Sequence, residues 1–254
     1  MSQIEPRFLV EQDTYRAGIV RGTDLKRQRR VVIKLARGDV IKKEAEIYKR
    51  LGRIQGIPLI FGWCIPGPSH TSFICMQEFT QDLSQLVNDK GPLSLRLACR
   101  VAGSILGVLS RVHSKGIIHR DIKPHNIVYS PVGDLDLWQL AVIDWGLAFD
   151  VNEGSNSAPR FTGTPTFMSV SCLQGNAPHA LDDLESLLYL VEFVVTEDEL
   201  PWFNSEDLED LVRVKESWVP QNPFLQEFLT YVRDRSRGRT PDYDHLRQLL
   251  EAAA

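Results

Sequence analysis

Apolar residues in the first part of the chain form the short runs that are typical of β-strands. Strand-like segments are expected at residues 8–10, 18–20, 30–35, 57–63 and 72–79. After the third of these, Asp39 is expected to cap a helix that runs to Leu51 and ends at Gly52. The pattern therefore predicts a small sheet that carries one helix.

The expected helix has one apolar side. On a helical wheel this side is formed by Ile41, Ala45, Ile47, Tyr48 and Leu51. Glu44 falls within the apolar arc, whereas Glu46 points almost opposite. Glu44 is therefore expected to be the carboxylate on the buried side of the helix.

Helical periodicity dominates the second part of the chain. Helices are expected to begin at residues 83–87 and to cover residues 93–113, 181–195 and 243–253. The segment 181–195 is nearly continuously apolar but too short and too charged to cross a membrane, so we interpret it as a buried core helix. The hydrophobic pattern thus predicts an α+β fold with a β-rich first part and a larger helical second part.

Composition narrows the class of protein. With 254 residues, of which 43% are hydrophobic, the chain can bury the core of one large domain or two coupled domains. A net charge of -4 argues against broad nucleic-acid binding, and we expect the basic run at residues 26–30 to be a solvated turn between strands.

Several sequence features bear on the compartment. The four cysteines, which we expect to be reduced thiols, lie far apart at Cys64, Cys75, Cys99 and Cys172. No stretch is long enough to span a bilayer, and residues 1–6 lack the pattern of a secretion signal. We therefore expect an intracellular soluble protein, cytoplasmic or nuclear, with no membrane partner.

Residues 119–126 read His-Arg-Asp-Ile-Lys-Pro-His-Asn, and Asp144-Trp145-Gly146 follows 18 residues after Asn126. This spacing combines an acid that can take a hydroxyl proton, a basic side chain near a polyphosphate and two oxygen ligands for a metal ion. The combination indicates phosphoryl transfer.

These two motifs resemble the H-R-D-L-x-x-x-N and D-F-G sequences of the eukaryotic protein kinase superfamily. Ile122 replaces the Leu and Trp145 replaces the Phe, and both changes keep the position apolar. The resemblance implies a two-lobed kinase fold, with residues 1–78 as the N-lobe and residues 79–254 as the C-lobe. It also implies that the protein uses ATP and Mg²⁺ and acts on a protein substrate.

The resemblance assigns roles to residues of these two motifs. Asp121 is expected to accept or orient the attacking hydroxyl group, while Asn126 and Asp144 are expected to bind magnesium. Lys123 is expected to steady the transferring phosphate, and a lysine at this place accompanies serine/threonine specificity in the family. His119 and Arg120 are expected to support the loop.

Lys34 ends a Val-Ile-Lys sequence that is similar to the V-A-I-K of kinases, where the lysine holds phosphates and pairs with a helix glutamate. Because Glu44 lies on the apolar side of the expected helix, it is the expected partner of Lys34, although a separation of ten residues between the two is short for the family. The alternative is a solvated lysine at the edge of a sheet.

The kinase resemblance also implies a hinge between the lobes. It is expected at residues 78–81, where Glu78 and Thr80 would contact the adenine of ATP, with Met76 or Gln77 as the gatekeeper residue.

A series of further motifs is similar to the casein kinase I group. They are Phe161–Ser169, Leu181–Leu187, Leu200–Trp202 and Pro241–Leu249, together with Glu44–Lys49 and Gly56–Pro58 nearer the start. In that group Thr164 would contact Asp121 and Lys123, and Asp183 would hold the backbone of the catalytic loop. The resemblance covers roughly residues 8–250.

The chain departs from the group at the loop that covers the phosphates. Aligning Gly22-Thr23-Asp24 with the group's G-T-D places Gln12, Thr14 and Ala17 at the three glycine positions, and Gly18 would partly substitute if the register shifted by one. Glycines let the backbone approach phosphates, so their loss is expected to weaken closure over a nucleotide.

The chain also departs at the surface that selects substrates in the group. Thr166 stands at a position that is often Arg, and acidic residues occupy the region beyond Leu200–Trp202, namely Glu206, Asp207, Glu209 and Asp210. Repulsion of phosphopeptides and a solvated acidic helix face are both open interpretations.

The activation segment offers Ser155, Ser157 and Thr162 but no compelling phosphorylation site, so we expect constitutive competence.

Three functions are compatible with these motifs. The leading hypothesis is a compact, monomeric serine/threonine kinase related to casein kinase I. The missing glycines favour a catalytically weak or inactive scaffold instead, and a kinase for small molecules agrees less well with Lys123 and Thr164.

Overall fold

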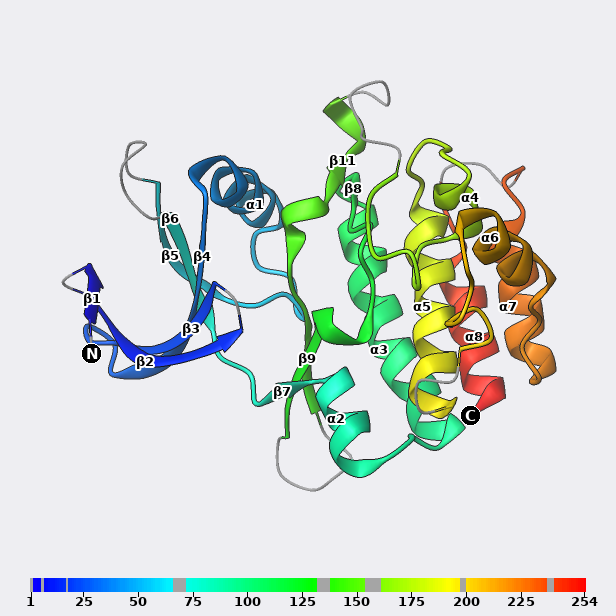
Figure 1. The fold of residues 1–254 in the computed structure, drawn as a ribbon, viewed down its shortest axis with the longest axis horizontal. Helices are drawn as coiled ribbons and strands as arrows, with labels where there is room; N and C mark the ends of the chain where they lie inside the picture. Colours follow the sequence, from blue (N-terminus) through cyan, green and yellow to red (C-terminus); the bar gives the residue numbers. More distant parts are fainter. Residues whose placement is uncertain are drawn as a thin grey trace.

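The computed structural model describes residues 2–5, 7–16, 18–65, 72–131, 138–153, 161–196, 200–236 and 240–254. A six-stranded antiparallel sheet opens the chain, and its strand order is β1-β2-β3-β4-β6-β5. The strands are β1 (Ser2–Glu5), β2 (Phe8–Arg16), β3 (Ile19–Asp24), β4 (Arg29–Ala36), β5 (Ile60–Cys64) and β6 (Ser72–Gln77). Figure 1 shows this sheet at one end of the molecule and most of the helices at the other.

One helix packs against the sheet, and its start differs from the prediction. Helix α1 (Gly38–Leu51) begins one residue before Asp39, so Asp39 lies in the first turn and is not the N-cap. The N-cap is Arg37, whose side chain makes no capping hydrogen bond. The carboxylate of Asp39 still interacts favourably with the positive end of the helix dipole. The helix ends at Gly52, as predicted.

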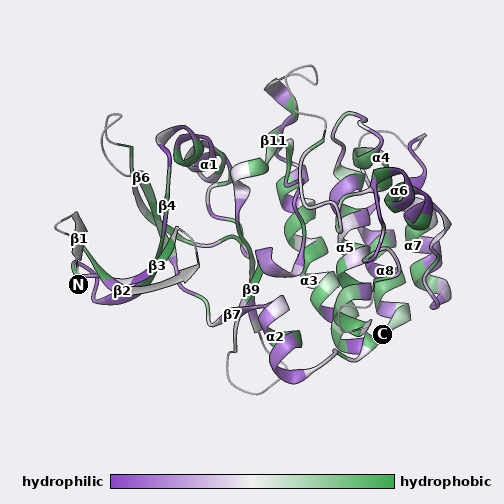
Figure 2. Ribbon diagram, in the orientation of Figure 1, coloured by the Kyte–Doolittle hydropathy of each residue, from purple (hydrophilic) through white to green (hydrophobic). Residues whose placement is uncertain are grey.

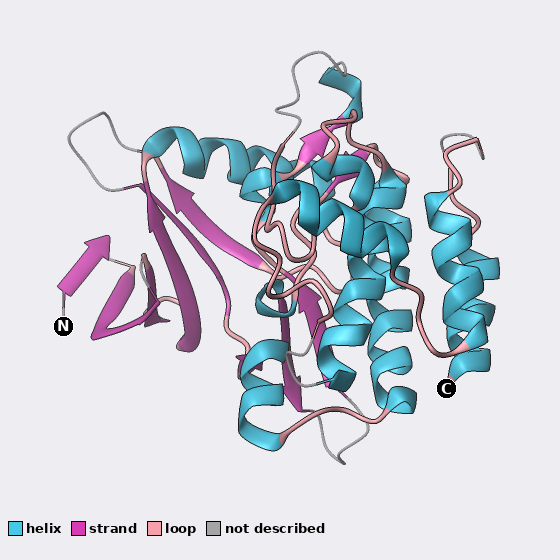
Figure 3. Cartoon of the chain, turned by 45° about the vertical axis from the view of Figure 1, so that its right-hand side comes forward, coloured by secondary structure: helices cyan, strands magenta, loops and turns pink. Residues whose placement is uncertain are grey.

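The rest of the chain is largely helical. Its helices are α2 (Leu83–Lys90), α3 (Leu95–His113), α4 (Val170–Leu173), α5 (Ala180–Thr196), α6 (Leu208–Ser217), α7 (Pro223–Arg233) and α8 (Tyr243–Ala253). Helix α3 starts two residues later than predicted because the side chain of Ser94 caps it by accepting from the backbone N–H of Leu97. The turned view in Figure 3 also keeps the N-terminal sheet and the helices on separate sides.

Short strands form two small sheets between these layers. Strands β7 (Gln81–Asp82), β9 (Ile127–Pro131) and β10 (Trp138–Val142) form one, and β8 (Ile117–Ile118) pairs with β11 (Phe149–Asp150). Short 3-10 turns follow β8 and β10, at Pro124–Asn126 and Trp145–Leu147. These turns lie at the strand ends where the two sequence motifs meet.

Helix α5 is the centre of the core. It is buried from Ala180 to Val191, as predicted for a core helix, and it packs against α3 and α7. Figure 2 shows much hydrophobic colour along α3 and α8. None of the helices in the described ranges is both long and apolar enough to cross a membrane. The core thus forms a rigid support for the loops that precede and follow β9 and β10.

Candidate active site

The first pair of functional side chains joins the sheet to its helix. Lys34 comes from β4 and Glu44 from the buried face of α1, where its side chain is fully buried. The Nζ atom of Lys34 lies 2.7 Å from Oε2 of Glu44. The predicted contact between the two residues is therefore present.

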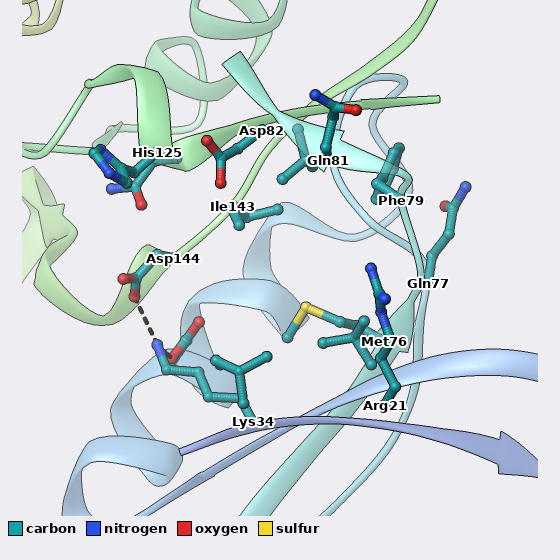
Figure 4. A pocket seen from close by; sticks show the side chains of 15 residues that line it. Arg21, Lys34, Met76, Gln77, Phe79, Gln81, Asp82, His125, Ile143 and Asp144 are labelled. Carbon is teal, nitrogen blue, oxygen red and sulfur yellow. Dashed lines mark hydrogen bonds and ion pairs between the residues drawn. The ribbon is translucent and has the colours of Figure 1, made fainter. Parts of the chain in front are cut away.

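The same lysine reaches across to the second motif. Its Nζ atom lies 2.6 Å from Oδ1 of Asp144, the bond drawn in Figure 4. Asp144 has a left-handed backbone with φ of 66°, and the next residue, Trp145, is fully buried. Its indole Nε1–H donates to the carbonyl of Val142 (3.1 Å), and its ring meets His119 edge-on at 4.5 Å. Trp145 thus anchors the strained turn that presents Asp144.

The charges at this junction shift one another's titration. Burial alone would lower the pKa of Lys34, but the carboxylates of Glu44 and Asp144 outweigh it and raise that pKa. Burial likewise opposes ionisation of Asp144, yet the charge of Lys34 holds the pKa of Asp144 below its ordinary value. Burial raises the pKa of Glu44, and the charge of Lys34 opposes that rise. Lys34 is thus a fixed cation at neutral pH.

A buried carboxylate anchors the backbone of the catalytic loop. Asp183, at the start of α5, accepts the backbone N–H groups of His119 (2.7 Å) and Arg120 (2.8 Å). His113 in α3 binds the same carboxylate at 2.8 Å and contacts the hydroxyl of Tyr243 in α8 at 2.5 Å. These bonds keep the pKa of Asp183 low although burial raises it. The predicted role of Asp183 as an anchor is confirmed.

The loop brings four predicted residues into contact. The hydroxyl of Thr164 donates to Oδ1 of Asp121 (2.7 Å), and Nζ of Lys123 donates to that hydroxyl (2.7 Å). Lys123 also forms an ion pair with Oδ2 of Asp121 (2.7 Å). The side-chain amide of Asn126 donates to the carbonyl and Oδ2 of Asp121, at 2.8 and 3.0 Å. Asp121 is therefore held from three directions.

His119 and Arg120 support this cluster, and the Nδ1 atom of His119 accepts the backbone N–H of Asp121 (3.2 Å). The backbone of Arg120 has φ of 69°, and its Nε–H donates to the carbonyl of Leu147 at 2.8 Å. The Nε2 atom of His119 lies 2.9 Å from the carbonyl of Ile143. Both side chains thus tie the loop to the segment around Asp144, as predicted.

A cleft of about 300 Å³ lies between the sheet and the helical part (Figure 4). Lys34, Glu44, Asn126 and Asp144 line its polar end. Its apolar walls are formed by Ile19, Val32, Met76, Phe79, Val128 and Ile143. A flat apolar slot with a polar end fits a heterocyclic base that carries phosphates. Both gatekeeper candidates, Met76 and Gln77, line the cleft.

The hinge side chains point elsewhere. The carboxylate of Glu78 pairs with Arg21 and Arg30, each at 3.1 Å. Thr80 donates its backbone N–H to the carbonyl of Tyr129 (3.0 Å), and its hydroxyl bonds Ser130. Neither Glu78 nor Thr80 is among the residues that line the cleft, so adenine binding by this segment stays a prediction for its backbone.

Sequence reasoning missed three ionisable residues that line the cleft, namely Arg21, Asp82 and His125. Arg21 is two positions after Ile19 on β3, so strand alternation places both side chains on one face. That alternation was a usable signal. Asp82 forms a capping box with Gln85 at the start of α2, so its carboxylate has a structural role as the cap of this helix.

The atypical phosphate loop is partly outside the described residues. Ala17 lies outside them, as do Ser155 and Ser157 of the activation segment. Gly18 has φ of 75°, and a Cβ atom there would lie 2.7 Å from the carbonyl oxygen of Leu35. The glycine is thus required by the close approach of this turn to β4.

The donor set at the polar end fits magnesium bound together with a nucleotide. One oxygen of Asp144 remains beside its bond to Lys34, and Asn126 uses its amide nitrogen toward Asp121, which leaves its oxygen. Magnesium prefers a few protein oxygens and completes its shell with water and phosphate. In the described part of the chain, no three His, Cys, Asp or Glu residues cluster as a metal site of their own.

Comparison with known proteins points to one family. The family model described as "Protein kinase domain" matches residues 17–227. The chain is 30% identical over 168 residues to "Casein kinase 1-like protein HD16" of Oryza sativa subsp. japonica, covering 63% of this chain and 23% of the relative. It is 26% identical over 256 residues to "Casein kinase I homolog 1" of Schizosaccharomyces pombe, covering 91% and 57%.

A bacterial relative is similar to a comparable degree. "Serine/threonine-protein kinase pkn3" of Myxococcus xanthus is 30% identical over 151 residues, which cover 56% of this chain and 27% of the relative. Across these three relatives, the chain spans from about a quarter to somewhat more than half of their length.

Proposed function

The chain belongs to the protein kinase family, which uses ATP with a divalent metal ion, and on this premise we propose that it is a serine/threonine protein kinase related to casein kinase I. The observation that carries the proposal is the contact of Asp121 with Thr164, Lys123 and Asn126, the last of which lines a cleft whose polar end also holds Lys34 and Asp144.

Each residue has a chemical role in this proposal. Asp121 orients the hydroxyl of the substrate and receives its proton, because the bonds from Thr164 and Asn126 fix the carboxylate in one orientation. Lys123 lies within reach of both Asp121 and Thr164 and balances charge on the transferred phosphate. Lys34, fixed by Glu44, holds the phosphates of ATP.

Asn126 and Asp144 would hold Mg²⁺, which neutralises charge on the phosphates when it is bound. Residues 1–78 and 79–254 would act as the two lobes. Protein substrates, a monomeric state and residence in the cytoplasm or nucleus belong to the same proposal.

The bond between Lys123 and Thr164 supports serine/threonine specificity, as does the similarity to the serine/threonine-protein kinase of Myxococcus xanthus. A preference for acidic substrates of the casein kinase I type is less well supported. The N-cap of α6 is Asp207, followed by Glu209 and Asp210 in its first turn, so this helix presents negative charge.

The test is transfer of radiolabelled phosphate from ATP to casein in the presence of magnesium, with wild type and Asp121→Asn compared. We expect incorporation by the wild type and a loss of at least about a hundredfold in the variant, because the variant cannot accept a proton. Equal silence of both proteins, together with a rise of the melting temperature on adding nucleotide, would instead favour the scaffold function that the glycine-poor loop suggests.

A further inference from the structure

A second hollow runs along one side of α3. It consists of two adjoining parts of about 560 and 540 Å³, which share Gly103, Ser104, Leu140 and Arg247 as lining residues. One part reaches Arg96 near the start of α3, and the other reaches Arg111 near its end. The two parts therefore form one continuous groove, which we call the α3 groove.

The charge of the α3 groove is opposite to that of the chain. Five arginines line it, namely Arg53, Arg96, Arg100, Arg111 and Arg247, against a single acidic side chain, Glu251, among its described lining residues. The whole chain carries 29 basic and 33 acidic residues, a net charge of -4. Positive charge thus predominates in the α3 groove.

Three of the arginines have no partner among the residues that the structure describes. The guanidinium groups of Arg53, Arg96 and Arg247 make no hydrogen bond or ion pair with another residue in the described ranges. One nitrogen of the Arg111 guanidinium donates to the carbonyl of Gln55 (2.8 Å), and this bond fixes the orientation of the side chain. Unpaired arginines around one hollow repel one another, and bound anions would relieve that repulsion.

The floor of the groove is open and partly apolar. A Cβ atom on Gly103 would meet nothing within 4 Å, so the middle of α3 leaves room for a chain to lie across it. Leu59 is 47% exposed at one wall, and Leu97 and Leu140 are partly buried. The groove therefore offers apolar contacts between its cations.

We propose that the α3 groove binds a peptide segment of a partner or substrate protein that carries acidic groups, carboxylates or phosphates, interspersed with apolar residues. The span from Arg96 to Arg111 is about 22 Å at 1.5 Å per residue, which an extended segment of about seven residues covers. Arginine forks bind both kinds of anion through paired hydrogen bonds.

The same features disfavour a nucleic acid as the occupant. The net charge of the chain repels a long polyanion, and Phe79 is the one aromatic residue among the described residues that line the groove, so it offers no series of stacking platforms. The groove also adjoins the hinge, because Gln77 and Phe79 line both it and the catalytic cleft. An occupant would therefore touch the back of the segment that faces the nucleotide.

Fluorescence anisotropy with labelled ten-residue peptides of alternating leucine and acidic residues tests the proposal. Glutamate, phosphoserine and glutamine versions separate carboxylate binding from phosphate binding and from purely apolar binding. We expect the double variant Arg96→Gln/Arg247→Gln to bind the better acidic peptide about tenfold more weakly and to lose part of the salt dependence, since two ion pairs are removed.

A second variant, Gly103→Glu, places a carboxylate in the middle of the groove, at a position where an added Cβ atom would meet nothing within 4 Å and where Glu favours a helix more than Gly does. It should weaken binding at least as much as the double variant. The charge-matched control Lys26→Gln/Arg27→Gln, on the distant turn between β3 and β4, should leave the affinity within about twofold.

Equal affinities in groove and control variants would overturn the proposal, as would binding of the glutamine peptide as tight as that of the acidic ones. Tighter binding of a single-stranded RNA oligonucleotide than of any peptide would also overturn it. The proposal does not depend on catalysis, because Asp121→Asn should bind the peptide as the wild type does, whereas the same variant decides the proposed kinase activity.

Discussion

The buried lysine of α6 shows how one side chain can hold a functional segment. Lys215 is fully buried, and its Nζ atom donates to the carbonyls of Pro165 (2.8 Å) and Met168 (2.7 Å), just after Thr164. Burial lowers the pKa of Lys215 to about 7, although the charge of Glu185 opposes the shift. A neutral amine still has two hydrogens for the two carbonyls, so the segment stays held when the charge is lost.

The lowered pKa of Lys215 makes a pH prediction with a definite sign. From pH 7 to pH 9 the unfolded chain binds a proton at this residue that the folded chain does not, so its contribution to stability rises with pH. We expect the free energy of unfolding of the wild type to rise by about 2 kcal/mol relative to that of Lys215→Met in this range, because all of the range lies between the folded and unfolded pKa values of Lys215. Urea unfolding of both proteins at each pH measures it, and parallel stability curves would contradict it.

Glu44 and Glu46 provide a second contrast at the residue scale. Glu44→Gln keeps the shape of a fully buried side chain but removes the charge that holds Lys34, whereas Glu46 is exposed on the other side of α1. We expect the KM for ATP to rise about tenfold in Glu44→Gln, because the loss of a charged hydrogen bond costs roughly 1.4 kcal/mol of binding free energy. The KM should be unchanged in Glu46→Gln. Steady-state kinetics with varied ATP decides it, and equal KM values would refute the role of the pair.

At the scale of elements, the turn between β2 and β3 depends on its glycine. Gly18 and Gly175 have nearly the same φ, 75° and 76°, but only a Cβ atom on Gly18 would clash with backbone, 2.7 Å from the carbonyl oxygen of Leu35. We expect Gly18→Ala to lower the free energy of unfolding by about 2–3 kcal/mol and Gly175→Ala by about 1 kcal/mol. Thermal or urea unfolding measures both, and equal losses would show that the clash is relieved by movement.

Elements were predictable where periodicity and caps agree. Helix α8 spans the residues expected from the pattern, and Glu44 was placed on the buried face of α1 by the wheel alone. The start of α1 was predicted wrongly because an acid in a first turn and an acid at an N-cap give the same local signal. Local patterns thus locate elements better than their first residues.

The site was predictable only where motifs encode it. Motif spacing indicated Asn126 and Asp144, which line the cleft, and Asp121, which is bonded to Asn126. The burial of Lys215 depends on α6 packing under the segment that follows Thr164, and no local pattern of residues 208–217 distinguishes it from a solvated lysine. The arginines of the α3 groove come from segments far apart in the chain, so only the fold could collect them.

At the scale of the whole molecule, Lys34 connects the N-terminal sheet to Asp144. Its bond to Asp144 crosses the cleft, and in the proposed function the same carboxylate would also bind the metal ion. Asp144→Asn keeps the size of this side chain but removes its charge. The nucleotide should still enter the apolar slot, whereas the metal ion should lose its strongest protein ligand.

We therefore expect ATP with a chelator to raise the melting temperatures of wild type and Asp144→Asn alike. Added magnesium should give a further rise in the wild type only, because a ligand that binds the folded state stabilises it in proportion to its affinity. Asp39→Asn, at an exposed carboxylate in the first turn of α1, is the control and should behave as the wild type does. A magnesium-dependent rise that survives in Asp144→Asn would mean that this carboxylate does not bind the metal, and the proposed division of roles between Asp121 and Asp144 would have to be abandoned.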